Sequence, residues 1–189
     1  MLKAGMDSCY QIIDIIDEQM VAHSGPRLAK LVELANFSSM LGNLLRAEIA
    51  AASDGMYKGN KPHTYPDLIP QRPDAYNLEI KTALEKNLPK GHLPKPGRHI
   101  TFRYVLSNND GTYTKGVDQR GDVARIWEIR VGELTESDFN ISNTAGDSGK
   151  TAVVKGDAFK RMAIVYFAPD YFPYSNVERF KDDNPVSFA

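Results

Sequence analysis

The segment TYPDLIPQRPDAYNLEIKTAL, residues 64–84, has the pattern of a β-hairpin. Two short extended runs, YPDLI at residues 65–69 and NLEIKTAL at residues 77–84, are separated by PQRPDAY. The prolines and the aspartate of the intervening stretch favour a turn. We therefore predict two neighbouring strands joined by a short connection.

The second strand of this hairpin carries a charged pair in otherwise apolar surroundings. Because strand side chains alternate between two faces, Glu79 and Lys81 share one face. Leu78 and Ile80 then point to the other face, where they can anchor the strand in a core. A half-exposed strand with a surface ion pair shows the same alternation, so this pattern alone does not indicate a function.

The chain before the hairpin is predicted to be helical. Residues 8–22 have a helical pattern that ends at the sequence HSGP, after which a second helix opens at Arg27. A third helix is expected over residues 39–53, with Ser38 or Ser39 as its N-cap. The N-terminal part is therefore expected to pack as a group of helices.

The chain after the hairpin is rich in further strand patterns. These are HITFRYVL, ARIWEIRV and RMAIVYFA, at residues 99–106, 124–131 and 161–168. The polar sequence from residue 175 onward indicates a loosely held tail. We predict a single α/β domain over residues 1–189, with a central mixed β-sheet flanked by helices. Its parts are a helical region (1–55), a sheet-containing core (56–170) and a C-terminal tail (171–189).

Composition excludes several classes of protein. The chain has 189 residues, of which 42% are hydrophobic and 25% charged, as in an ordinary globular domain. Cys9 is the only cysteine, which excludes an internal disulfide and a cysteine-based zinc site. Acidic residues interrupt the apolar pattern of residues 1–20, so we expect neither a signal peptide nor a membrane span, and a cytoplasmic location. With a net charge of −1, binding to nucleic acid would require a local cluster of positive charge.

The predicted third helix places a carboxylate on its apolar side. At about 100° per residue, Glu48 falls near the middle of an arc that includes Leu41 and Leu45, while Asn43 and Arg46 lie opposite. A charge on an inward face is costly unless it is paired or bound to a metal. Glu48 is therefore either a candidate site residue or a partner in a structural ion pair.

These residues, taken in order, resemble the PD-(D/E)XK nuclease superfamily and, within it, the type II restriction endonucleases. The resemblance rests on Glu48 in a helix, Pro66-Asp67 on one strand and Glu79-Ile80-Lys81 on the next. It covers roughly residues 41–106 and implies a restriction-endonuclease-like core. A competing dipeptide, Pro73-Asp74, falls in the predicted turn, so the aspartate role is assigned to Asp67 with Asp74 as the fallback.

The resemblance implies Mg²⁺-dependent hydrolysis of phosphodiester bonds in double-stranded DNA. Asp67 and Glu79 would bind the metal together with the backbone carbonyl of Ile80, since hard oxygen ligands suit Mg²⁺. Glu48 would hold a second ion or a metal-bound water. Lys81 would orient the attacking water or stabilise negative charge on the phosphate. A homodimer is expected because two active sites are the simplest way to cut both strands.

A basic segment follows the charged pair. It contains Lys86, Lys90, Lys95, Arg98 and Arg103, with no acidic residue between positions 86 and 103. Such residues can bind a DNA backbone through salt-dependent phosphate contacts that do not depend on base sequence. A solvated surface loop, balanced by acidic residues elsewhere, is the alternative interpretation.

Other readings of the sequence lead to different functions. TAGDSGKT, residues 144–151, ends like a phosphate-binding P-loop, but Thr144 stands where that motif has glycine. The β-branched sequence after it is also a poor start for the helix that the motif requires. The remaining alternatives are a DNA repair or recombination nuclease of the same fold and a DNA-binding or assembly module without catalysis.

Overall fold

The computed structural model describes residues 1–61, 64–142 and 151–183 of the chain. Within them, six strands form a mixed sheet in the order β1-β2-β3-β5-β6-β9, and three form a small sheet in the order β4-β8-β7. The strands are β1 (Tyr57–Gly59), β2 (Leu68–Pro70), β3 (Leu78–Leu84), β4 (Lys90–Gly91), β5 (Gly97–Ser107), β6 (Val123–Leu134), β7 (Phe139–Ser142), β8 (Thr151–Val154) and β9 (Ala163–Phe167).

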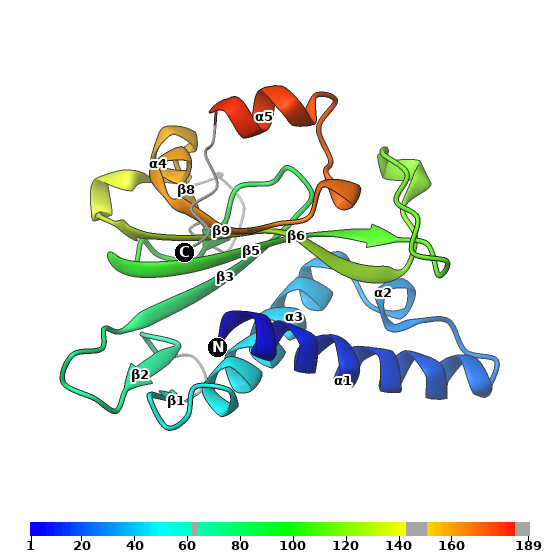
Figure 1. Ribbon diagram of the computed structural model, residues 1–189, viewed down its shortest axis with the longest axis horizontal. Helices are drawn as coiled ribbons and strands as arrows, with labels where there is room; N and C mark the ends of the chain where they lie inside the picture. Colours follow the sequence, from blue (N-terminus) through cyan, green and yellow to red (C-terminus); the bar gives the residue numbers. More distant parts are fainter. Residues whose placement is uncertain (62–63, 143–150, 184–189) are drawn as a thin grey trace.

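Helices cover both faces of the large sheet (Figure 1). The helices are α1 (Leu2–Ala22), α2 (Leu28–Leu31), α3 (Leu34–Ala51), α4 (Gly156–Arg161) and α5 (Val177–Asp183). The first three lie below the sheet in the view of Figure 1, and α4 and α5 lie above it. The prediction of an α/β fold with a mixed central sheet flanked by helices is confirmed.

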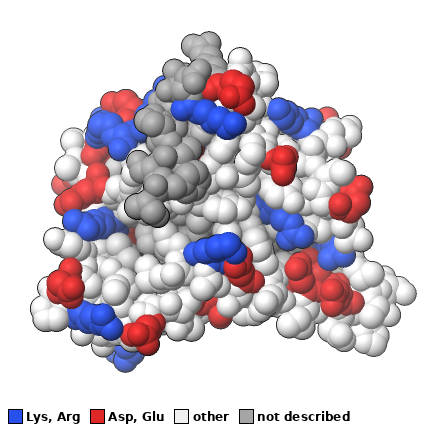
Figure 2. Space-filling view, in the orientation of Figure 1, with Lys and Arg blue, Asp and Glu red and all other residues white. Residues whose placement is uncertain are grey.

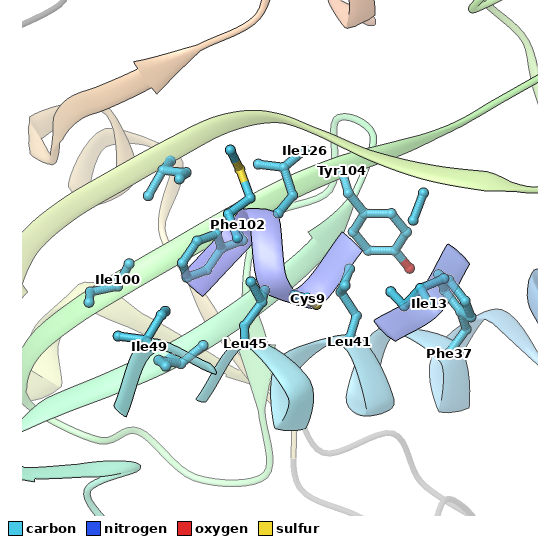
Figure 3. Close-up of a cluster of buried hydrophobic side chains, with 14 of the residues drawn as sticks. Cys9, Ile13, Phe37, Leu41, Leu45, Ile49, Ile100, Phe102, Tyr104 and Ile126 are labelled. Carbon is cyan, nitrogen blue, oxygen red and sulfur yellow. The ribbon is translucent and has the colours of Figure 1, made fainter. Parts of the chain in front are cut away.

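The main hydrophobic core lies between the N-terminal helices and the sheet (Figure 3). Helix α3 contributes Phe37, Leu41, Leu45 and Ile49, whose spacing of four residues places them on one buried face. Against them pack Cys9 and Ile13 of α1 and Ile100, Phe102 and Tyr104 of β5. Helix α1 approaches α3 closely at Gly5, where an added Cβ would lie 2.7 Å from Ile49 Cγ1.

The predicted strands are confirmed, but the third helix begins earlier than expected. Strands β2 and β3 pair antiparallel, as the hairpin pattern predicts. Helix α3 starts at Leu34, so Ser38 and Ser39 lie inside the helix and neither serves as its N-cap. Burial of Phe37 against the sheet gains more than a serine cap provides, so packing sets the start of the helix.

Part of the C-terminal segment forms a helix that the sequence analysis did not predict. Residues 177–183 form α5, whose Phe180 packs 6.0 Å from Trp127 and 4.9 Å from Phe172, between ring centroids. The prediction of a loosely held tail is therefore wrong for this helix. Among the polar residues that suggested a tail, Phe180 is partly buried against the aromatic cluster on the far face of the sheet.

The end of the hairpin leaves one strand edge open. Strand β2 pairs with β3 only through Leu68 and Leu78, while β3 pairs along its whole length with β5, in parallel. Beyond Leu78, the outer edge of β3 has no strand partner in the described part of the chain. This edge borders the candidate site.

Candidate active site

A cavity of about 680 Å³ lies along the open edge of β3. Its lining comes from α3, from the end of the connection before β2, from β3 itself and from the segment between β4 and β5. The lining includes Ser38, Ser39, Asn43, Arg46, Asp67, Glu79, Ile80, Lys81, Lys90, His92, Lys95 and Thr151. Charged side chains of both signs thus meet in one hollow.

The charged pair of β3 lies as the alternation predicts. Leu78 and Ile80 are 7% and 6% exposed and belong to the core beneath the sheet. Glu79 and Lys81 line the cavity, and Lys81 Nζ lies 2.5 Å from Glu79 Oε1. The Glu79 side chain is fully buried, so this pair is not a surface ion pair.

Asp67 is attached to the same strand through the backbone. It stands immediately before β2, and its Oδ2 accepts a hydrogen bond from the Ile80 amide at 2.8 Å. The carboxylate thus satisfies a backbone donor that β2, ending its pairing at Leu78, leaves free. Asp74 is exposed in the turn and does not line the cavity, which supports Asp67 over the fallback.

A second lysine also contacts Glu79. Lys95, in the connection between β4 and β5, places its Nζ 2.6 Å from Glu79 Oε1. Tyr65 holds this connection in place, because its hydroxyl donates to the Pro96 carbonyl and its ring lies under Lys95 at 5.6 Å. Gly97 permits this contact: its φ is 131°, and a Cβ there would lie 2.5 Å from the Tyr65 hydroxyl. The bond to Glu79 was not anticipated from the sequence.

The pKa values of the two carboxylates are shifted in opposite directions. Burial raises the pKa of Glu79, but Lys81 and Lys95 outweigh it, so its pKa is lowered. The pKa of Asp67 is raised, first by burial and then by the charge of Glu79, against the Ile80 amide and the two lysines. Glu79 is therefore ionised at neutral pH, and Asp67 is the carboxylate that takes up a proton more readily.

His99 lies behind the charged pair and was not predicted to be near it. It is fully buried on β5, directly opposite Glu79 in the parallel ladder, and its Nδ1 lies 3.0 Å from the Gly97 carbonyl. Burial lowers the pKa of His99, with the Gly97 carbonyl acting in the opposite sense. Only the register of β3 with β5 brings His99 here, and a single sequence does not specify a parallel register.

The oxygen atoms around Glu79 suit a hard divalent cation. Glu79 Oε2 is buried without a hydrogen-bond partner among the described residues. Asp67 lines the same cavity, whereas the described residues contain no group of three or more Asp, Glu, His or Cys side chains that could hold a metal. Mg²⁺ usually takes one or two protein carboxylates and keeps several waters, so the donor set of Asp67, Glu79 and the Ile80 carbonyl fits it.

Helix α3 contributes polar residues that the sequence interpretation left outside the site. Ser39, Asn43 and Arg46 recur at intervals of three and four residues, so they share one face, and all line the cavity. Thr82 fixes the helix to β3, since its hydroxyl donates to the Ser38 carbonyl at 2.8 Å. Placing Arg46 away from the core was correct, but that face borders the cavity rather than open solvent. The polar spacing was the available signal.

Glu48 is not brought together with the other predicted site residues. It is half-buried, does not line the cavity and lies near α1. Burial, reinforced by the charge of Glu48, raises the pKa of the Cys9 thiol to about 12. The apolar side of α3 packs against both the sheet and α1, so an inward position on this helix need not face the sheet.

We expect the Glu48→Gln variant to fold and to retain any cleavage activity of the parent within about twofold, because the substitution lies outside the cavity and keeps the side-chain shape. Thermal unfolding and plasmid cleavage would measure both properties. Glu79→Gln, assayed beside it, should lose activity. A large loss of cleavage in Glu48→Gln would restore Glu48 to the site.

Only part of the basic segment faces the cavity. Lys90 and Lys95 line it. Lys86 lies over the ring of Tyr174 at 5.2 Å, and Arg98 stacks on Tyr76 at 3.4 Å.

Arg103 is buried and therefore does not belong to the predicted DNA contacts. Its side chain is 3% exposed and its Nε lies 2.5 Å from Glu128 Oε2. Because β5 alternates its side chains as β3 does, Arg103 points into the aromatic cluster on the far face of the sheet, against Trp127. The residues that precede Arg103 in the basic segment include no acidic partner, because its partner, Glu128, belongs to β6.

The distribution of charge on one face of the molecule is mixed. Lys, Arg, Asp and Glu are interspersed over the face shown in Figure 2. In the described part of the chain, no helix combines the length and hydropathy that a bilayer crossing requires. The P-loop-like stretch 144–151 lies outside the described residues except for Thr151, which begins β8.

Comparison with known proteins assigns no family to this chain. No protein-family model matches the sequence, and no curated protein matches it significantly.

The raised pKa of Asp67 has a consequence for stability. A carboxylate whose folded pKa lies above 3.8 contributes stability below the unfolded pKa and loses it as pH rises through the folded value. Asp67→Asn keeps an acceptor for the Ile80 amide and removes the charge, so its melting temperature should exceed that of the parent at pH about 7 and converge with it near pH about 4.

A substitution of Glu79 is expected to change the melting temperature in the opposite direction and serves as a control. Its lowered pKa means that its contribution is present above 4.5 and lost as pH falls through the folded value. Glu79→Gln should therefore melt below the parent at pH about 7. Thermal unfolding over this pH range would check both variants, and a lower melting temperature for Asp67→Asn at neutral pH would contradict the assignment.

Proposed function

We propose that this protein is a Mg²⁺-dependent DNA endonuclease of the PD-(D/E)XK type, acting on double-stranded DNA as a homodimer. The observation that carries the proposal is the meeting of Asp67, Glu79 and Lys81 at the open edge of β3, in a cavity lined by further cations. A mixed sheet with a helix packed beside the hairpin supports it. The restriction type is proposed from the sequence resemblance.

Each residue has a distinct task in this proposal. Asp67, Glu79 and the Ile80 carbonyl would hold Mg²⁺. When bound, the metal supplies Lewis acidity at the phosphate and lowers the pKa of a coordinated water. Lys81, held by Glu79, presents an ammonium that stabilises negative charge on the phosphate and orients the attacking water.

The cations of the cavity wall favour a polyanionic substrate. Lys90 of β4 and Arg46 of α3 line the same cavity. Backbone phosphates carry the charge that such side chains bind, and guanidinium groups bind phosphate oxygens in pairs. With a net charge of −1 for the whole chain, attraction to DNA depends on this local group.

The direct test is incubation of plasmid DNA with the protein in Mg²⁺ and, separately, in EDTA. We expect cleavage in Mg²⁺ only. Discrete fragments from a linear substrate would support a restriction enzyme, and a smear would instead favour a repair or recombination nuclease of the same fold. Binding without cleavage under every condition would support the non-catalytic alternative and overturn the proposal.

DNA affinity should fall linearly in log K against log salt concentration, because phosphate contacts release counterions. Replacing both Lys90 and Lys95 by alanine should flatten that slope by about two. The matched control replaces Lys58 and Lys160, exposed lysines outside the cavity, and should leave the slope unchanged. An equal slope in both double variants would remove the cavity lysines from the DNA interface.

A further inference from the structure

Both lysine contacts to Glu79 fall on one carboxylate oxygen. Lys81 Nζ lies 2.5 Å and Lys95 Nζ 2.6 Å from Oε1, whereas the buried Oε2 has no hydrogen-bond partner in the part of the chain described. A buried carboxylate normally satisfies both oxygens. Oε2 of Glu79 can therefore accept a further ligand, while the two ammonium groups at Oε1 balance the charge of the carboxylate.

The two lysines differ in how firmly they are held. Lys81 belongs to β3 itself, two residues from Glu79, and its side chain is 16% exposed. Lys95 belongs to the connection between β4 and β5, and its side chain is 33% exposed. Its ammonium reaches Glu79 along the ring of Tyr65, 5.6 Å from the centroid. Lys95 is thus the cation that can leave without disturbing the sheet.

Electrostatic repulsion favours the release of one of them when a divalent cation binds. Lys81 and Lys95 both contact Glu79, and Lys90 and Arg46 add further positive charge to the same cavity. A divalent cation on the same carboxylates would add two positive charges beside two ammonium groups in a partly desolvated space. Repulsion at such distances is strong where water is excluded. Release of Lys95, the more exposed of the two lysines, relieves this repulsion at the lowest structural cost.

We propose that Lys95 is an exchangeable cation: it occupies Glu79 in the metal-free protein, leaves when a divalent cation binds, and then presents its ammonium to a phosphate in the cavity. This inference rests on the proposed nuclease function and adds a means of coupling metal binding to DNA binding. Lys95 is a positioning residue here, since it acts through Glu79 and through its own movement.

Calorimetric titration of metal-stripped protein with Ca²⁺ tests the exchange without requiring catalysis. Lys95→Met keeps the aliphatic stem and removes the charge, so Ca²⁺ should bind about tenfold more tightly than to the parent. Lys90→Met removes a charge from the same cavity at a residue without a bond to Glu79, and should change the affinity by no more than about twofold. Lys95→Arg restores the cation and should return the affinity toward that of the parent.

Each outcome decides the matter. Equal or weaker Ca²⁺ binding by Lys95→Met, in a variant whose circular dichroism and melting show a folded protein, overturns the exchange while the nuclease proposal stands on parental cleavage. Equal gains in Lys95→Met and Lys90→Met would reduce the effect to general electrostatics and also overturn it. A parent that binds no Ca²⁺ and cuts no plasmid would overturn both proposals together.

Discussion

Replacement of Lys81 by methionine is expected to reduce Mg²⁺-dependent cleavage of plasmid DNA by about 100- to 10,000-fold, the range typical of a positioned acid–base group. The ammonium lies on the cavity face of β3, 2.5 Å from Glu79, and is the cation closest in sequence to the proposed metal ligands. Methionine keeps most of the side-chain volume, so the strand should pack as before. Cleavage rates in excess enzyme would measure the loss.

Measurements of metal affinity would distinguish the role of Lys81 from that of the carboxylates. The Lys81→Met variant should bind Ca²⁺ as well as the parent or more tightly, because it loses only a positive charge near Glu79. Asp67→Ala should lose both cleavage and metal affinity. Asp74→Ala, in the exposed turn, should cut normally. If Lys81→Met and Asp67→Ala both cut at the parental rate, the assignment of this hairpin to catalysis is wrong.

The strand order of the sheet was beyond what the sequence specifies, although most strands were predictable. The strand patterns located β3, β5 and β6 within a few residues, because most of the side chains in these strands are buried. The start of α3 was missed, since its N-cap position, Glu33, forms no side-chain cap hydrogen bond and packing of Phe37 extends the helix. Local signals mark ends only where local interactions determine them.

Site residues that share one strand were predictable from the sequence, whereas contacts between different elements were not. Period two places Glu79 and Lys81 on one face of β3, and the resemblance to the nuclease superfamily adds Asp67; the structure brings all three to one cavity. Glu48 was misplaced because a helical wheel gives the apolar side of a helix without telling which neighbour covers it. Arg46 entered the site from the polar side for the same reason.

The face of the sheet that carries Glu79 and Lys81 also contains, on β5 and β6, a buried ionic group that the sequence concealed. Glu128 of β6 is fully buried between two arginines. Its Oε2 accepts from Arg103 Nε at 2.5 Å, and its Oε1 accepts from Arg130 Nε at 2.9 Å. Trp127 and Phe159 cover the guanidinium of Arg103, at 4.2 and 4.8 Å from their ring centroids. One buried carboxylate thus bridges two buried arginines.

Replacement of Glu128 by alanine is therefore expected to destabilise the protein by about 3–5 kcal/mol, because it removes the carboxylate that the buried guanidinium of Arg103 contacts. Arg103 would keep its bond to the Tyr174 hydroxyl, but that hydroxyl carries no full negative charge. Urea unfolding at neutral pH would measure the change in the free energy of unfolding.

Glu133 offers a matched control on the same strand. Its side chain is 70% exposed and lies 3.9 Å from Arg98 Nε, so Glu133→Ala should cost less than about 1 kcal/mol. A similarly small effect in Glu128→Ala would mean that the arginines find other compensation, and that the far face of the sheet is held by its aromatic cluster alone. A large effect confined to Glu128 would show that the carboxylate is required to bury Arg103, the residue whose place in the basic segment had suggested DNA contact.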